Sequence, residues 1–347
     1  MTGGGRALSP AAEEYFDRLL TEAGRADSPS RRHHYVPRTY LRQWAYDERR
    51  IWALNTSTGI AKPLGISDVC VKENFHRVVG PDGPHNRVEL MFGVVDSELR
   101  RVQSVLLRLS DPDDLSFDDY MALGVTMAVQ RMRTLQQRRL HQQQAAWLEA
   151  QNPNDFQRLQ DTPNNPHLVA GFHTETLFRA MWEAADVLTG RQLEIWDDSQ
   201  GRIVTSDVPV VVPFRAGARP NLLAAPQIFW PISPDRVVVL SNEDRGEKAV
   251  FRRVTAAMAA ALRGHVIQGR EQMIFAGESQ LRYLPVGKTL PRRAQARLRC
   301  SQWSPQGEYV PPPGCVVEWT DGYGATPDVQ LCDQGWHRNA PGMLDYI

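Results

Sequence analysis

VELMFGVVDSELRRVQSVLLRL, residues 88–109, decides the fold class more than any other stretch of the chain. Its apolar residues recur every three or four positions: Val88, Met91, Val95, Leu99, Val102, Leu106 and Leu109. This spacing gathers them on one face of an α-helix and leaves charged residues on the other. Asp111 and Pro112 then end the pattern. The stretch therefore predicts a long amphipathic helix that buries one face.

A second long helix is predicted immediately afterwards. Ser116 and Asp119 are spaced as in a capping box, which marks a helix start. The apolar positions that follow recur at helical spacing: Met121, Val125, Ala128, Met132 and Leu135. The two helices are expected to pack as an antiparallel pair. The Gln-rich segment that continues to residue 155 has no matching apolar stripe, so we expect its distal end to be solvated or, as the alternative, to reach a partner.

Shorter elements are predicted on both sides of this pair. Ser9 and Pro10 open a helix that Gly24 ends, a short helix follows Pro37, and Ile51 and Ile60 begin the strands of a hairpin. A further helix is predicted over 174–188 and another from Thr255. Between them lie β-prone runs at 193–196, 203–204, 209–214, 227–231 and 237–240. These runs favour an antiparallel sheet.

The predicted fold class is therefore α+β. It has a helical N-terminal part with a small hairpin, two long packed helices and a mainly antiparallel sheet, followed by an irregular tail rich in Trp, Pro and Gly. The expected organisation is an N-terminal helix and linker (1–30), a mixed core domain (31–284) and a C-terminal extension packed on it (285–347).

Composition limits the class of function. The 40 basic and 40 acidic residues balance, so no overall field draws the protein to nucleic acid or lipid. No segment has the apolar core of a signal peptide or membrane span, which favours a cytoplasmic protein without membrane association. The four cysteines are Cys70, Cys300, Cys315 and Cys332. They lack the C-x-x-C spacing of zinc sites and are expected to be reduced. A disulfide among the last three of them stays open. The oligomeric state stays open too.

RRHHYVPRTYL, residues 31–41, carries the strongest chemical signal. The adjacent His33 and His34 offer the usual metal ligand and the usual general base, and Arg38 offers a forked donor for phosphate or carboxylate. The phrase HHYVP is similar to the opening of ββα-metal nucleases. Those continue with a hairpin, whereas RTYLRQW here predicts a helix. The alternative interpretation is a structural histidine that packs under Tyr35 and Trp44.

Five short segments together carry a family resemblance. In order they are RHHYVPRTYLRQW, VCVKENFH, QRMRT, TSDVPV and FWPISP, and they span roughly residues 31–240. They resemble the sequence of domain-of-unknown-function family 4238, a bacterial family. The resemblance implies relatives and no particular reaction. This chain departs from the family pattern at Leu135, where proline is usual, at His76, where tyrosine is usual, and at Val208, where asparagine is common.

The candidate site combines these segments. His33, His34 and Asp207 are the candidate catalytic residues. A carboxamide and a guanidinium three residues apart share a helix face, so Gln130, Arg133 and Arg38 are the candidate substrate-binding residues. Candidate metal ligands are His33, Asp207 and Glu89, with a divalent ion of unknown identity. His76 is a weaker candidate that packing would explain as well.

These residues predict a hydrolase, in its most specific form a metal-assisted nuclease or phosphodiesterase that acts on an anionic substrate such as nucleic acid or a nucleotide. Two alternatives stay open. One is a binding module for an anionic ligand or peptide without catalysis. The other is a metal-dependent enzyme that modifies a small molecule or peptide, which a redox metal in a facial triad would favour.

Overall fold

The structure is a computed structural model that describes residues 28–80, 83–111, 114–138, 177, 181–213, 222–223, 225–242 and 250–290, with four short strands between 297 and 318. Three predicted features lie outside these residues: the N-terminal helix, the Gln-rich segment beyond residue 138 and most of the C-terminal tail. The described residues form a mixed α+β fold in which antiparallel strand pairing dominates.

The first of two four-stranded sheets has the strand order β11-β7-β10-β9, and helices cover both of its faces. Their bounds are Val250–Arg253 for β11, Gln192–Asp197 for β7, Arg236–Ser241 for β10 and Gln227–Pro231 for β9. Every pairing is antiparallel except β11 with β7. Strand alternation sends Val238 and Leu240 to one hydrophobic cluster and Val237 and Val239 to another, so both faces of the sheet are buried.

One face of this sheet packs against α3 (Arg87–Arg108), α4 (Phe117–Met132) and a helix over 181–189. As predicted, α3 buries its apolar stripe, and Ser116 caps α4 by accepting a hydrogen bond from the Asp119 N–H at 3.1 Å. The sequence predicted that α4 buries only one face, but α4 is buried on all sides, because every residue from 121 to 132 is buried. Gly124 explains part of this: a Cβ there would lie 2.3 Å from Thr189 Cγ2.

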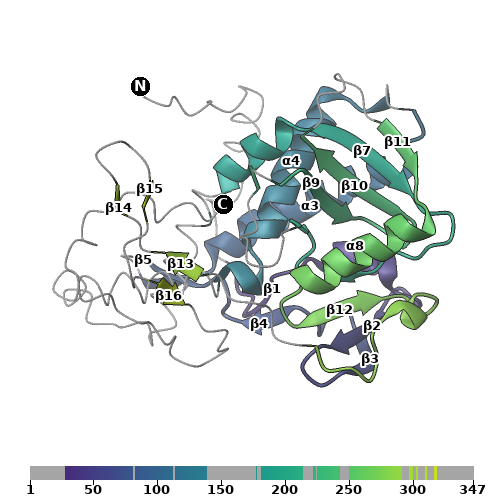
Figure 1. Ribbon diagram of the computed structural model, residues 1–347. Helices are drawn as coiled ribbons and strands as arrows, with labels where there is room; N and C mark the ends of the chain where they lie inside the picture. Colours follow the sequence, from purple (N-terminus) through teal and green to yellow (C-terminus); the bar gives the residue numbers. More distant parts are fainter. Residues whose placement is uncertain are drawn as a thin grey trace.

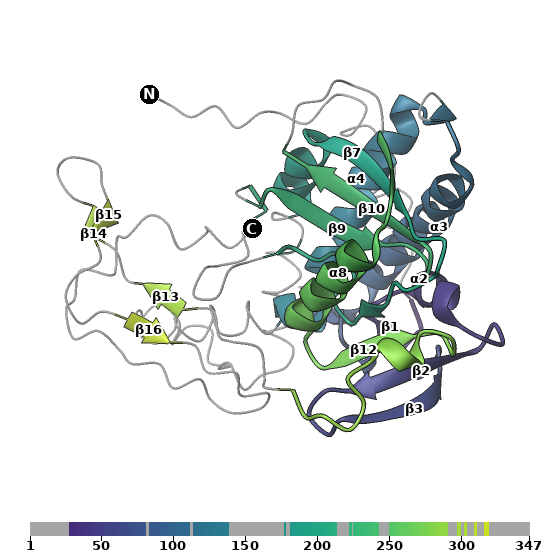
Figure 2. The same cartoon turned by 45° about the vertical axis from the view of Figure 1, so that its right-hand side comes forward.

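The other face of the sheet packs against α8 (Ala256–Gly269), which also contacts a second sheet. That sheet has the order β3-β2-β12-β8, with β3 Ile60–Gly65, β2 Arg50–Asn55, β12 Met273–Ala276 and β8 Thr205–Ser206. Figures 1 and 2 both show α8 between the two sheets. The predicted hairpin is confirmed as β2 and β3. The run predicted at 209–214 forms no strand over its described residues and makes one isolated bridge, from Val211 to Phe229.

The histidine segment begins with β1 (Arg32–His34), which pairs with β4 (Val71–Glu73), and continues into α2 (Arg38–Leu41) and the 3-10 helix η1 (Arg42–Trp44). Buried side chains fix α2 and η1 to the sheets. The Tyr40 hydroxyl donates to the Pro231 carbonyl at 2.7 Å and lies 2.6 Å from Thr205 Oγ1, while Trp44 Nε1 donates to the Ile203 carbonyl at 3.1 Å. Four of the five family segments thus meet.

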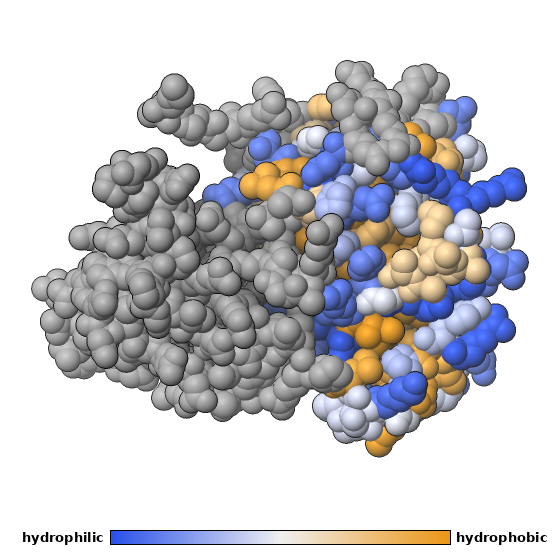
Figure 3. All heavy atoms as spheres, viewed as in Figure 1, coloured by the Kyte–Doolittle hydropathy of each residue, from blue (hydrophilic) through white to orange (hydrophobic). Residues whose placement is uncertain are grey.

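Small elements complete the described structure: β5 (Val78–Gly80) paired with β6 (Gly83–His85), η4 (Leu281–Tyr283), β13 (Arg297–Arg299) paired with β16 (Val316–Glu318), and β14 (Gln302–Trp303) paired with β15 (Tyr309–Val310). Within the described part of the chain, none of the helices has the length and hydropathy needed to span a membrane. Figure 3 shows hydrophilic and hydrophobic residues interspersed over the described part of one face.

Candidate functional site

The strand β1 separates the two adjacent histidines. Its register pairs His33 with Lys72 and His34 with Val71 across β4, and neighbouring side chains in a strand point to opposite faces. His33 is fully buried, whereas His34 is half-buried. Asn74, which follows β4, has a φ of 53°, a conformation that asparagine adopts more readily than most residues. The idea that the two rings divide the work at one metal ion has no support in this arrangement.

Both ring nitrogens of His33 are engaged by backbone groups. The His76 N–H donates to His33 Nδ1 at 2.8 Å, so the lone pair lies on Nδ1 and the proton on Nε2. That Nε2–H donates to the Ser30 carbonyl at 3.0 Å. Burial, followed by the charges of Arg138 and Arg77, lowers the pKa of His33 despite this bond. His33 is thus a neutral ring that joins β1 to the segment after β4 and hydrogen-bonds a backbone carbonyl.

His34 keeps one nitrogen for chemistry. Its Nε2 lies 3.3 Å from the Ser67 carbonyl, which places the proton on Nε2 and the lone pair on Nδ1. Burial lowers the pKa of His34 to about 4, and the positive charges of Arg38, Arg133 and Arg32 contribute. The ring is therefore neutral at physiological pH. A bound anion that offsets these arginines would raise its pKa.

Glu89 lies beside two buried imidazoles. Its Oε1 is 3.7 Å from His33 Nδ1 and 3.7 Å from His76 Nε2, and the two rings stack with centroids 5.8 Å apart. The Glu89 side chain is 17% exposed, and burial raises its pKa to about 8 against the opposing charge of Arg133. Burial also lowers the pKa of His76 well below its usual value. At neutral pH the Glu89 carboxyl group is therefore protonated, and the His33 and His76 rings are uncharged.

Arg133 is a completely buried guanidinium that α4 brings to α3. Its Nη2 donates to Asp96 Oδ1 at 2.6 Å, and its Cζ lies 5.2 Å from the centroid of the Phe92 ring. Glu89, Phe92 and Asp96 lie at positions i, i+3 and i+7 of α3 and so share one helix face. Nε and Nη1 of Arg133 are buried and have no hydrogen-bond partner among the described residues. Two donors of a buried cation are thus left for a ligand.

We call His33, His34, His76, Glu89, Asp96 and Arg133 the histidine–arginine cluster. Two other predicted substrate-binding residues flank it. The charge of Arg38 acts on both His34 and Asp96, which places Arg38 near the exposed side of the cluster. Gln130 lies one turn before Arg133 and is 1% exposed, and neither of its side-chain polar atoms has a hydrogen-bond partner within the described part of the chain.

Asp207 directly follows β8, the edge strand of the second sheet. Its Oδ1 accepts from the Glu271 N–H at 2.9 Å, and its Oδ2 accepts from the Gln272 and Met273 N–H groups at 2.7 and 3.0 Å. Burial raises its pKa to about 7, and these N–H donors oppose the rise. The carboxylate therefore anchors the turn before β12. Ser206 stabilises the adjacent turn, because its hydroxyl accepts from the Val208 N–H at 3.2 Å.

The predicted metal ligands do not converge. Glu89 and His33 are neighbours, but both nitrogens of His33 and both oxygens of Asp207 already bond to backbone groups. Among the residues that the structure describes, no group of three or more His, Cys, Asp or Glu side chains is arranged to hold a metal ion. A divalent metal therefore stays a prediction from the sequence.

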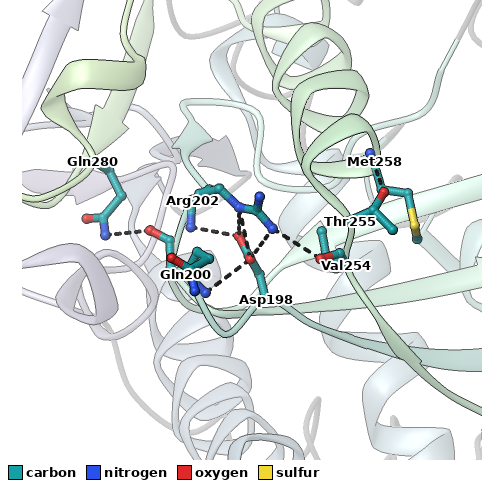
Figure 4. A network of polar contacts seen from close by, with 8 residues as sticks. Asp198, Gln200, Arg202, Val254, Thr255, Met258 and Gln280 are labelled. Atoms are coloured by element: carbon teal, nitrogen blue, oxygen red, sulfur yellow. Dashed lines mark hydrogen bonds and ion pairs between the residues drawn. The ribbon is translucent and has the colours of Figure 1, made fainter.

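A groove of about 770 Å³ lies elsewhere, between the segments 43–46, 199–201, 234–235 and 277–280. Figure 4 shows part of the polar network that shapes it, in which Asp198 accepts from Gln200, Arg202 donates to Asp198, and Gln280 donates to the Gly201 carbonyl. The described residues that line the groove include no histidine, lysine or arginine. Imidazole and guanidinium side chains gather instead in the histidine–arginine cluster, which we take as the candidate site.

Sequence reasoning missed one member of this cluster, Asp96, and one buried arginine close to it, Arg138. Asp96 gave no motif, although a carboxylate at the edge of an apolar stripe, seven residues after Glu89, is a signal that could have suggested it. Arg138 lies in the segment after α4, is 8% exposed, and donates from Nη1 to the Phe75 carbonyl. Its position after a Gln pair gave no sign of burial.

The fold and the cluster together define a mixed α+β protein with buried imidazoles and a buried guanidinium at the junction of β1, β4, α3 and α4. The chain belongs to the protein family of unknown function DUF4238, whose profile matches residues 32–279. No curated protein and no solved structure matches it. The resemblance of the five segments is thereby confirmed as family membership.

Proposed function

We propose that the protein is a hydrolase that cleaves a phosphodiester of nucleic acid or a nucleotide at the histidine–arginine cluster. One observation carries the proposal: the buried Arg133 has two N–H donors without a partner among the described residues. A buried cation with unused donors is costly unless an anion completes it. Asp96 fixes one end of the guanidinium, so the remaining donors are already oriented for the phosphoryl oxygens.

His34 and Glu89 supply base and acid, and the charge of Arg133 acts on both. His34, neutral and with its lone pair on Nδ1, accepts a proton from water, and the resulting hydroxide attacks phosphorus. Glu89, protonated at neutral pH, gives its proton to the leaving oxygen. Water and diester become monoester and alcohol, and proton exchange with solvent restores both side chains. The phosphate charge at Arg133 and Arg38 offsets the field that lowers the pKa of His34, which makes the base stronger when substrate is bound.

Hydrolysis of bis(4-nitrophenyl) phosphate by the full chain tests this proposal. His34→Ala is expected to lower kcat/KM at least about 100-fold, the usual loss for a general base. His265→Ala on α8 is the matched control, because that half-buried ring packs on Phe229 away from the cluster. Full activity of His34→Ala would overturn the proposal. Assays with and without a chelator, alongside elemental analysis, test the predicted metal.

A binding module for an anionic ligand is the second candidate. It is favoured by the depth of the site, since Arg133 is fully buried and Glu89 is 17% exposed, which leaves little space for an attacking water. This candidate predicts saturable binding of inorganic phosphate by a protein that does not hydrolyse the diester. The hydrolase proposal predicts both binding and turnover.

A further inference from the structure

The groove of about 770 Å³ plays no part in the proposed function, and two glycines help to shape it. Gly201 has a φ of 56°, and its carbonyl accepts a hydrogen bond from Gln280 Nε2 at 2.8 Å. The carboxamide of Gln280 also packs on Gly277. A Cβ at Gly277 would overlap Gln280 Oε1 and lie 3.3 Å from the carbonyl oxygen of Trp44. The shape of the groove therefore depends on the absence of a side chain at Gly277.

The charged residues that line the groove are both acidic. Asp235 and Glu278 are exposed, and neither forms an ion pair within the described part of the chain. The Asp235 carboxylate accepts one hydrogen bond, from the hydroxyl of Ser233. Arg202, the arginine of the network in Figure 4, pairs with Asp198 at 2.6 Å, so its charge is already offset. The groove therefore offers two carboxylates to a cation.

The lining favours an organic cation over a metal ion. Among the residues that the structure describes, no group of three or more His, Cys, Asp or Glu side chains is arranged to hold a metal ion, and two carboxylates alone supply few of the ligands that a divalent ion needs. Tyr46 adds an aromatic ring to the groove. Arg50 already lies over this ring, with its Cζ 5.1 Å from the centroid, and pairs with Asp47 at 2.6 Å. The expected cation is thus an ammonium or guanidinium group.

Two carboxamides of the lining suit a peptide backbone. Gln43 is half-buried and Gln200 is exposed, and neither side chain makes a hydrogen bond within the described part of the chain. A carboxamide offers both a donor and an acceptor, which complement the C=O and N–H groups of a peptide, whereas a polyamine offers donors only. Pockets of about 300–1,000 Å³ are typical for small ligands, so a peptide bound here is short.

We propose that this groove binds a short basic segment of a partner protein. A lysine or arginine side chain of the segment meets the carboxylates of Asp235 and Glu278, and its backbone meets the carboxamides of Gln43 and Gln200. None of the residues that line the groove belongs to the histidine–arginine cluster, so this inference does not rest on the proposed function.

Calorimetric titration of the full chain at low salt with an N-acetylated, C-amidated peptide, Ala-Lys-Ala-Lys-Ala, tests the inference. This peptide is expected to bind saturably and about tenfold more tightly than the same peptide with glutamine in place of lysine. Asp235→Asn and Glu278→Gln, which remove charge and keep the shape, should each weaken binding about threefold, and together about tenfold. Ser199→Trp, which adds bulk at an exposed position of the lining, should abolish binding.

Asp118→Asn is the matched control, because Asp118 is exposed on α4, does not line the groove and loses the same charge. It should keep the affinity of the wild type. Thermal melting checks that each variant is folded. Absence of saturable binding, equal affinities for the two peptides, or unchanged affinity in the folded double variant or in folded Ser199→Trp would overturn the inference. Tighter binding of spermidine than of the lysine peptide would also overturn it, because the groove would then suit a polyamine.

Discussion

Arg133 Nη2 donates to Asp96 Oδ1 at 2.6 Å, and this ion pair joins the end of α4 to the middle of α3. The arginine is fully buried and the aspartate is 29% exposed. Arg133 is therefore the buried member of the pair, and two of its nitrogen atoms have no hydrogen-bond partner among the described residues. Asp96 is the member that contacts solvent. Asp96 therefore offsets part of the cost of burying the arginine, and the proposed anion would complete it.

Asp96→Ala should destabilise the fold by about 3–5 kcal/mol, because it leaves a buried guanidinium without its counter-charge. Phosphate should restore part of this loss by occupying the vacated position. Urea denaturation with and without 20-fold excess phosphate over its Kd, about 1.8 kcal/mol of expected stabilisation, measures both effects. Asp114→Asn, an exposed change before α4, is the control. An Asp96→Ala protein as stable as the wild type would contradict the assigned role of the pair.

Glu89 should make stability depend on pH. Its pKa is 4.5 in the unfolded chain and about 8 in the fold, so between these values the folded state holds more protons. This contribution is complete below pH 4.5 and is lost as the pH rises through about 8. The free energy of unfolding of the wild type relative to Glu89→Gln should therefore fall with rising pH, by at most about 1.4 kcal/mol per unit. Denaturation of both proteins from pH 5 to 9 measures the difference, and a flat difference would exclude the raised pKa.

The same groups set a pH profile for hydrolysis. In the free enzyme, activity requires neutral His34, whose pKa is lowered to about 4, and protonated Glu89, whose pKa is raised to about 8. The plot of kcat/KM against pH should therefore decline below about 4 and above about 8. In Glu89→Gln the upper decline should disappear together with most of the rate. A wild-type profile that keeps rising beyond pH 9 would show that a proton on Glu89 is not needed.

The sequence predicted the helices and strands well where one periodicity dominates, as in α3, β2 and β3. It predicted less about the site, for three physical reasons. The short strand β1 is too brief to display alternation, so nothing in the motif indicated that His33 and His34 face opposite sides. The pairing of Arg133 with Asp96 joins residues 37 apart and depends on how α3 packs on α4. The candidate residue Asp207 proved to be an anchor for backbone N–H groups, which no local pattern encodes.

Asp207→Ala separates that structural role from a catalytic one. The change leaves three buried backbone N–H groups without an acceptor, at about 1–3 kcal/mol for each. We expect the melting temperature to fall while kcat/KM for the diester, measured well below that temperature, stays within about threefold of the wild type. Loss of hydrolysis in a protein of unchanged stability would return Asp207 to the catalytic site.

The anion site at Arg133 is tested most directly by NMR of the arginine side chains. In a ¹⁵N-labelled sample, the Nε–H signal of Arg133, assigned with Arg133→Lys, is followed while inorganic phosphate is added. Nε has no hydrogen-bond partner among the described residues, so a bound phosphate should shift this signal downfield with saturation. The signal of Arg202, whose Nε already donates to Asp198, should stay in place. An Arg133 signal that does not move up to saturating phosphate would contradict the site and the hydrolysis built on it.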